Sequence, residues 1–156
     1  MKKLLVYYSL SGNTAKIAKK IADKAGCDIA EIKTKVPYTG DYNSIVSQGE
    51  DEVNSGFMPE ILPLEKNPAD YDEIIIGTPV WWYTFAPAVK TFLSQTDFSG
   101  KKVFPYATNG GWLGHTFKDV EKACKNATVG KGLNIRFNGN SMQTSEKEIE
   151  KWAETL

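Results

Sequence analysis

Short apolar runs alternate along this chain with segments of helical period. Residues 4–8 and 73–77 form runs that are too short for helices and suit strands buried in a sheet. Between them, residues 13–25 place apolar side chains on one helical face and lysines on the opposite face. This order predicts a parallel sheet with helices on both faces, because parallel strands need helical crossovers. Ligands of such a sheet bind beyond the carboxyl ends of its strands.

The same reading extends over the whole chain and predicts five strands and five helices. The strands are residues 4–8, 28–33, 73–77, 102–108 and 133–137. The helices are residues 13–25, 42–54, 86–94 and 116–125, and a last one that follows the capping box at residues 144–148. No repeat, low-complexity tract or linker is visible, so we expect a single domain over residues 1–156.

The net charge restricts the partners of the protein. Nineteen lysines and arginines balance nineteen acidic residues, and this excludes general affinity for nucleic acid or anionic lipid. The longest apolar runs are far below the roughly 18 residues that cross a bilayer. Cys27 and Cys124 form neither a disulfide framework nor a metal-binding spacing, so we expect a cytoplasmic protein without a metal site.

Charge is nevertheless unevenly distributed along the chain. Residues 41–73 carry nine acids against Lys66 alone, whereas residues 101–136 carry seven bases against two acids. Two solvated faces are the simpler interpretation, and a docking surface is the alternative.

Polar residues capable of binding an anion follow the first strand directly. Residues 9–14 run into the helix at residue 13 and include three hydroxyls, one amide and one glycine: Ser9, Ser11, Gly12, Asn13 and Thr14. A helix N-terminus attracts anions through its free N–H groups and its dipole. A simple helix cap would need only one such residue, so this density favours a phosphate site.

Three known types of phosphate loop do not match. No lysine follows Gly12, as a mononucleotide P-loop requires, and the three spaced glycines of a dinucleotide loop are missing. No cysteine lies in the loop, which excludes a phosphatase of the cysteine type. The loop is therefore expected to hold a phosphate without cleaving it.

Residues 5–21 resemble the flavodoxin signature in every restricted position. The matching residues after the aliphatic start are Tyr7, Ser9, Gly12, Thr14, Ala18 and Ile21. The resemblance covers essentially the whole chain and implies an α/β sandwich, doubly wound, with a five-stranded parallel sheet in the order 2-1-3-4-5. It also implies that the loop holds the 5′-phosphate of flavin mononucleotide (FMN).

A second loop, after the third strand, is rich in aromatic residues. Four aromatics lie within residues 81–85, and the flat apolar isoalloxazine ring of FMN would stack well on an indole. A hydrophobic plug over the sheet edge is the alternative. The resemblance assigns the ring contacts to Thr78, Pro79, Val80, Trp81, Trp82 and Tyr83, without deciding which tryptophan stacks. Tyr83 stands where flavodoxins usually have a glycine with a redox-linked peptide flip, and a tyrosine takes positive φ only at a cost.

A third loop, after the fourth strand, is rich in glycine. Close backbone approach to the polar edge of the flavin is the role that the resemblance implies for Asn109, Gly110 and Gly111. Trp112 departs from the family, where small residues are more common, and would be a lid or a partner surface. His115 is the only histidine, and we interpret it as a polar residue at a helix start without a catalytic role.

The function that the resemblance implies is that of a flavodoxin, which carries electrons between redox partner proteins through non-covalently bound FMN. The alternative on the same fold is an FMN-dependent NAD(P)H reductase of quinones, azo compounds or flavins. A third alternative is a flavin-free interaction module. No catalytic residue of the protein itself is predicted, and a monomer is the expectation.

Overall fold

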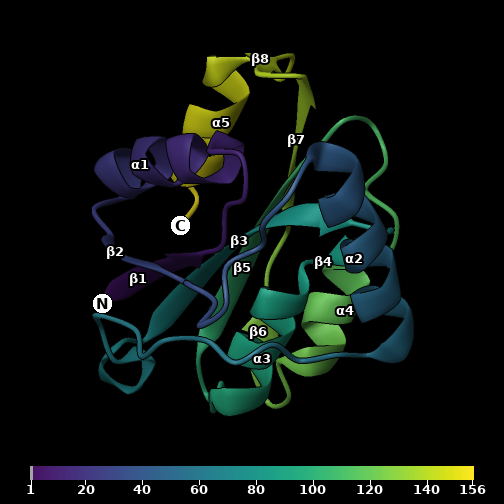
Figure 1. Ribbon diagram of the computed structural model, residues 1–156. Coiled ribbons are helices and arrows are strands. Elements are labelled where there is room, and N and C mark those ends of the chain that lie inside the picture. The colour runs from purple at the N-terminus through teal and green to yellow at the C-terminus, as the bar shows by residue number, and fades with distance from the viewer. Residues whose placement is uncertain (1) are drawn as a thin grey trace.

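Figure 1 shows the computed structural model of the chain, which describes residues 2–156. The strands are β1 (Lys3–Tyr7), β2 (Asp28–Glu31), β3 (Glu73–Trp81), β4 (Thr84–Phe85), β5 (Lys102–Asn109), β6 (Thr128–Val129), β7 (Leu133–Asn138) and β8 (Ser141–Met142). The helices are α1 (Asn13–Ala25), α2 (Tyr42–Ser55), α3 (Pro87–Gln95), α4 (Thr116–Ala123) and α5 (Glu146–Ala153), with a 3₁₀ turn η1 at Pro68–Asp70. Every predicted helix and strand is present, with small shifts at most ends.

The sheet has the predicted topology. Its main path is β2-β1-β3-β5-β7, and each neighbouring pair on that path is parallel, so the predicted order 2-1-3-4-5 is confirmed. The sequence pattern missed the short strands. β8 forms an antiparallel hairpin with β7, and β6 pairs with the first half of β5 while β7 pairs with its second half.

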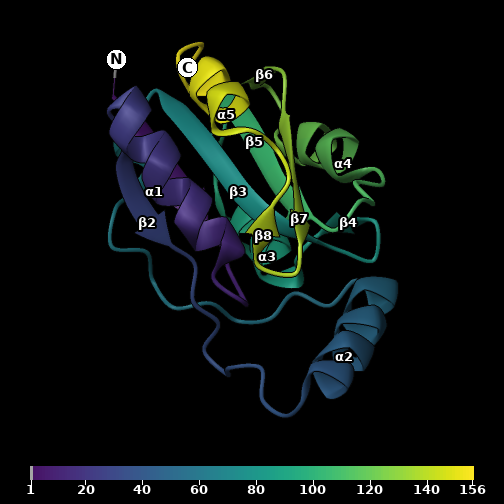
Figure 2. The ribbon, with the colours of Figure 1, turned by 90° about the horizontal axis from the view of Figure 1, so that it is seen from above.

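Both faces of the central strands are buried, as their unbroken apolar sequences require. On one face, Leu5 and Ile75 pack with Ile17 of α1 and Ile149 of α5. On the other face, the alternate strand residues pack with α3 and α4; this set includes Leu4, Ile74, Ile76, Val89, Phe92 and Val120. Figure 2 shows α1 and α5 together on one side of the sheet, with α4 on the other.

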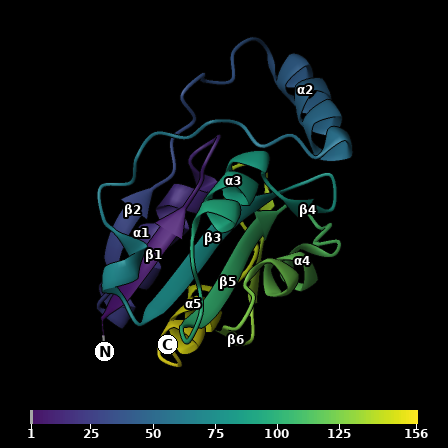
Figure 3. The ribbon, with the colours of Figure 1, turned by 90° about the horizontal axis from the view of Figure 1, so that it is seen from below.

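Helix α2 does not cover a face of the sheet. Figures 2 and 3 show it beyond one end of the sheet, and its last turn lies against α3, where Lys90 Nζ donates to the carbonyl oxygen of Gly56. Only Gly49 and Glu52 of this helix are buried, in keeping with its thin apolar stripe. After α2 the chain returns to the sheet through residues 57–67, which we call the strap. Ile61 of the strap forms an isolated antiparallel β-bridge with Thr34, and Ile61 and Leu64 pack against the core. The strap therefore covers part of the sheet face that α2 does not cover.

Two further sequence expectations concern membranes and cysteines. Each helix within residues 2–156 is too short or too polar to span a lipid bilayer. Cys124 is buried and Cys27 is partly buried, and both are free thiols. Burial raises the pKa of both thiols, to about 12 for Cys124 and about 11 for Cys27, so neither is a reactive thiolate at neutral pH.

The close approach of β3 and β5 at Gly77 generates a stability prediction. A Cβ atom at Gly77 would lie 2.2 Å from Cζ of Tyr106, whose buried hydroxyl donates to the carbonyl oxygen of Thr14 at 3.0 Å. The ring cannot move away without losing that bond, so Gly77→Ala is expected to lower the free energy of unfolding by about 1–3 kcal/mol. Urea denaturation measures this. Gly110→Ala is the control, because the nearest atom lies 3.9 Å away, and equal losses would contradict the argument.

Glu73 generates a prediction about pH. Its side chain is 2% exposed, its Oε2 has no partner among residues 2–156, and it lies in register between Lys3 and Lys102. Burial raises the pKa of its carboxyl group against the opposing effect of the two lysines. The folded protein therefore holds this proton more tightly than the unfolded chain, and ionisation destabilises the fold as pH rises.

Glu73→Gln removes this ionisation. The variant is expected to gain unfolding free energy over the parent protein near pH 7 and to lose that gain near pH 4, where both states are protonated. Urea denaturation at the two pH values measures the difference. An equal gain in unfolding free energy at pH 7 and at pH 4 would show that ionisation of Glu73 does not affect stability.

Candidate functional site

The loop between β1 and α1 is held by its first serine. Ser9 Oγ accepts from the backbone N–H of Gly12 at 3.1 Å and of Ala15 at 3.2 Å. Gly12, the residue before α1, has a φ of +100°, which a residue with a Cβ atom rarely adopts. Ser9 and Gly12 thus set the shape of the loop.

The same loop leaves donors free for a ligand. Among residues 2–156, no acceptor is found for the backbone N–H groups of Ser11, Asn13 and Thr14. These groups lie at the start of α1, where the helix dipole is positive, and they can bind a phosphate. Ser11 is exposed and can add its hydroxyl.

The side chains of Asn13 and Thr14 are already engaged within the fold. Thr14 is buried, and its hydroxyl lies 2.7 Å from that of Thr108 on β5. Asn13 Nδ2 donates to the carbonyl oxygen of Gly139 at 3.1 Å, in the turn between β7 and β8. Both residues therefore offer a ligand their backbone groups in this structure, and their side chains tie the loop to the sheet.

The aromatic segment after Gly77 is a hairpin, which corrects the predicted loop. Strand β3 continues to Trp81 and pairs antiparallel with β4 at Thr84, so the predicted strand end at Gly77 is wrong. The β-branched and aromatic residues there suit an extended strand. The connection consists of Trp82 and Tyr83, with φ of +50° and +69°. Tyr83 does adopt the positive φ that its sequence disfavours.

Neighbouring groups hold this turn. The carbonyl oxygen of Tyr83 accepts from the backbone N–H of His115 at 2.8 Å, and Trp82 Nε1 donates to the carbonyl oxygen of Val46 in α2 at 3.2 Å. Gly114 lies so close that a Cβ atom there would be 2.3 Å from the oxygen of Tyr83. The hairpin is thus fastened on one side to α2 and on the other to the loop after β5.

A pocket of about 210 Å³ lies between the hairpin and the loop that follows β5. Its lining consists of Val80, Trp82, Tyr83, Asn109, Gly110 and Trp112. The structure thus brings together five residues that the sequence predicted for the flavin ring. Trp112, with 73% of its surface exposed, joins them in the lining, where an indole can lie over a bound ring. We call this cavity the ring pocket.

The glycine-rich loop is shaped by Asn109. Its Oδ1 accepts from the N–H of Gly111 at 2.8 Å, and its Nδ2 donates to Asn134 Oδ1 at 2.6 Å. Gly111 has a φ of +132° and faces the guanidinium of Arg136. The Gly111 N–H is used by Asn109, whereas no acceptor is found within residues 2–156 for the N–H of Gly110, so this donor is free for a ligand.

The other residues predicted for the second loop do not line the ring pocket. Thr78 is fully buried, and its hydroxyl donates to the carbonyl oxygen of Pro79 and accepts from the N–H of Ala86. Pro79 is in register with Thr108 inside the sheet. Trp81 packs away from the pocket, while Trp82 lines it, so the structure separates two tryptophans that the sequence could not distinguish.

Trp81 belongs to an aromatic cluster that sequence analysis did not find. Its ring makes edge contacts with Tyr8 at 6.0 Å and with Tyr38 at 5.1 Å between centroids. It also faces Gly49 of α2, where a Cβ atom would lie 3.1 Å from the indole. The hydroxyl of Tyr38 donates to Glu52 of α2 at 2.6 Å. This cluster joins α2 to the sheet edge, through contacts between segments that lie far apart in the sequence.

The electrostatics of that cluster follow from burial. Desolvation is the largest effect on both phenols, and it raises the pKa of Tyr8 and of Tyr38 far above the ordinary value. The hydrogen bond to the Glu52 carboxylate raises the pKa of Tyr38 further. Both phenols stay protonated at neutral pH, so Tyr38 acts as a fixed donor to Glu52.

Comparisons with known proteins agree with this geometry. The sequence model of a family described as flavodoxin matches residues 2–156. A Bacteroides eggerthii protein with a provisional flavoprotein designation is 31% identical, with a TM-score of 0.82 over 99% of this chain and 96% of its own. A flavoprotein of Lactobacillus acidophilus NCFM in complex with FMN is 26% identical, with a TM-score of 0.76 over 97% and 98% of the two chains.

A curated enzyme is also similar to part of the chain. An NAD(P)H dehydrogenase (quinone) of Archaeoglobus fulgidus is 32% identical over 101 residues, which are 60% of this chain. The match spans 50% of the length of that relative.

The positive φ at Tyr83 generates a further stability prediction. Tyr83→Gly is expected to raise the free energy of unfolding by about 1 kcal/mol, because glycine adopts this conformation without strain and the tyrosine is 53% exposed. Tyr42→Gly is the matched control: this tyrosine is 77% exposed at the start of α2, and glycine there should lower stability. Guanidinium denaturation of both variants tests this, and equal losses would mean that the turn is not strained.

Proposed function

This chain belongs to the flavodoxin family, and from that premise we propose that it binds FMN non-covalently and passes electrons between redox partner proteins. One observation carries the proposal: free N–H donors at the start of α1 and an aromatic ring pocket lie at the same carboxyl edge of the sheet. A phosphate and a flat apolar ring on one molecule fit that combination. The FMN complex of the Lactobacillus acidophilus flavoprotein, which has the same fold, supports it.

Different residues would bind the phosphate and the ring of FMN. The backbone N–H groups of Ser11, Asn13 and Thr14 would hold the phosphate, while Ser9 and Gly12 keep the loop in shape. Trp82, Tyr83 and Trp112 would enclose the ring, and the N–H of Gly110 would face its polar edge. When bound, FMN supplies the one- and two-electron chemistry, and the protein tunes its potential.

The charge around the site would oppose reduction. The loop at residues 9–14 contains no cation, and the hairpin is bonded to α2, which carries Glu50, Asp51 and Glu52 and no base. These acidic groups would disfavour added negative charge on the flavin and lower its potential, as an electron donor requires, while the guanidinium of Arg136 beside Gly111 would act in the opposite direction. The same acidic helix would attract a basic partner protein, even though the chain is neutral overall.

A reductase is the second candidate function. The partial similarity to an NAD(P)H dehydrogenase (quinone) favours it, and so does a hairpin turn without the usual glycine. In this candidate, electrons from NAD(P)H would reach a small acceptor through the same FMN. Steady oxidation of NAD(P)H by the FMN-loaded protein with a quinone would establish the reductase. Its absence, together with reduction of the flavin by a partner protein, would establish the carrier.

Titration with FMN and with riboflavin tests cofactor binding and the role of the loop. Quenching of flavin fluorescence gives both dissociation constants, and we expect FMN to bind at least about a hundredfold more tightly, because riboflavin lacks the phosphate. Trp82→Ala is expected to weaken FMN binding about tenfold through lost stacking. Tyr42→Ala, at an exposed residue outside the ring pocket, is the control. Equal affinity for FMN and riboflavin would exclude the phosphate site. If neither flavin binds, the flavin-free interaction module is the function that remains.

A further inference from the structure

A second cleft lies beside the hairpin, and the proposed flavin site does not use it. Its volume is about 310 Å³, near the lower end of the range for small-molecule sites. The end of α2, strand β4 and the starts of α3 and α4 form its walls. It shares no lining residue with the ring pocket, although the hairpin and the loop before α4 contribute to both. We call it the α2–α4 cleft.

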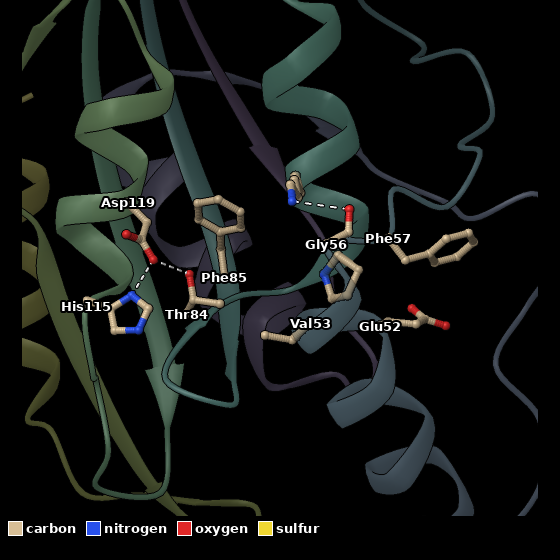
Figure 4. A pocket seen from close by; sticks show the side chains of 10 residues that line it. Glu52, Val53, Gly56, Phe57, Thr84, Phe85, His115 and Asp119 are labelled. Atoms are coloured by element: carbon tan, nitrogen blue, oxygen red, sulfur yellow. Dashed lines mark hydrogen bonds and ion pairs between the residues drawn. The ribbon is translucent and has the colours of Figure 1, made fainter.

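One end of the cleft carries a histidine held by a carboxylate. Figure 4 shows His115 and Thr84 both pointing to Asp119. Asp119 Oδ2 is bonded to Nδ1 of His115 and accepts from the hydroxyl of Thr84 at 2.6 Å. A carboxylate that binds Nδ1 keeps the proton there, so that Nε2 is the atom that gains or loses a proton. Nε2 is bonded to no group among residues 2–156, and more than half of the side chain is exposed.

The other end carries an ammonium group. Lys90 Nζ donates to the carbonyl oxygen of Gly56 at 3.2 Å, which fixes the end of the side chain and leaves two of its three donors for a ligand. In Figure 4, Gly56 lies across the cleft from His115, with Phe85 between them. The polar groups thus stand at opposite ends.

The middle of the cleft is apolar. Val53, Phe85 and Pro87 line it, and a planar ring can pack against them. Glu52, the other carboxylate of the lining, accepts from Tyr38 at 2.6 Å and from Gln48 at 2.8 Å, so both of its oxygens are satisfied outside the cleft. The volume admits one or two fused rings and excludes a dinucleotide.

The two ends suit an oxygen that changes its hydrogen-bonding role. Protonated, Nε2 of His115 donates to a carbonyl oxygen, and neutral, it accepts from a hydroxyl group. A quinone presents carbonyl oxygens at opposite ends of its ring, and its reduced form presents hydroxyls at the same places. Lys90 can bond to the second oxygen in either form, because a carbonyl and a hydroxyl both accept.

We propose that the α2–α4 cleft binds a quinone-type ring between His115, which is positioned by Asp119, and Lys90. The proposal adds a substrate site to the second candidate function above. Binding itself does not depend on FMN, so the two can fail separately.

The single histidine of the chain makes the test direct. Menadione is titrated into the protein without FMN while the imidazole resonances of His115 are followed by NMR. We expect saturable shifts of these resonances with menadione and at least about fivefold weaker binding of 2-methylnaphthalene, which has the rings without the oxygens. Resonances of His115 that stay unmoved at saturation would overturn the proposal.

Variants locate the contacts by calorimetry with menadione. Lys90→Met and His115→Phe each remove one polar end and are each expected to weaken binding about fivefold or more. Lys118→Met is the matched control, because Lys118 lies exposed on α4 outside the cleft. Circular dichroism tests whether each variant is folded. If one of the two variants does not fold, the affinity of the other for menadione decides the outcome. Unchanged affinity in a folded Lys90→Met or His115→Phe protein would overturn the proposal.

Competition with FMN separates this site from the ring pocket. Menadione binding that persists in FMN-saturated protein supports the α2–α4 cleft. Displacement of menadione by FMN would place it in the ring pocket and overturn the inference. If FMN does not bind at all, the cofactor proposal fails, while the His115 shifts and the two variants still decide the quinone site.

Discussion

Burial of both faces of β1, β3 and β5 is the constraint on which the rest of the structure depends. Every residue of these strands that points to either face needs a helix or an extended segment against it, because apolar surface left in water would cost too much free energy. Helical crossovers satisfy this need and force the strands to be parallel. Parallel strands end at one edge, so the loops after β1, β3 and β5 meet there.

Helix α2 shows how the same constraint produces a site. Its two buried residues, Gly49 and Glu52, do not suffice to cover a sheet face, and the strap at residues 57–67 contributes to that face instead. The helix therefore lies at the carboxyl edge of the sheet. Trp81 packs against it, and Tyr38 and Trp82 donate hydrogen bonds to its Glu52 side chain and to its Val46 carbonyl oxygen. Both the ring pocket and the α2–α4 cleft lie beside the hairpin that these contacts hold.

The position of the acidic segment bears on the carrier and the reductase in different ways. An acidic helix bonded to Trp82 at the ring pocket suits electrostatic docking of a basic partner protein. A cleft with an imidazole and an ammonium at its ends suits a small acceptor instead. Both features depend on α2, so the two candidate functions share one structural cause.

The sequence by itself determined the order of the five main strands and the five helices, the loop at the start of α1 and the family, because periodicity and short motifs are local properties. The resemblance to flavodoxins assigned Val80, Trp82, Tyr83, Asn109 and Gly110 to one site at the carboxyl ends of the strands, and these residues line one pocket. Tertiary structure alone decided that Trp82 lines the pocket while Trp81 packs against α2, because Trp81 is the last residue of β3 and Trp82 the first of a hairpin turn that the sequence pattern did not locate. It alone also held Tyr83 at a positive φ and brought Thr84 to Asp119, because those contacts link segments that lie far apart in the sequence, whereas the contact between His115 and Asp119 is a local one between residues four apart.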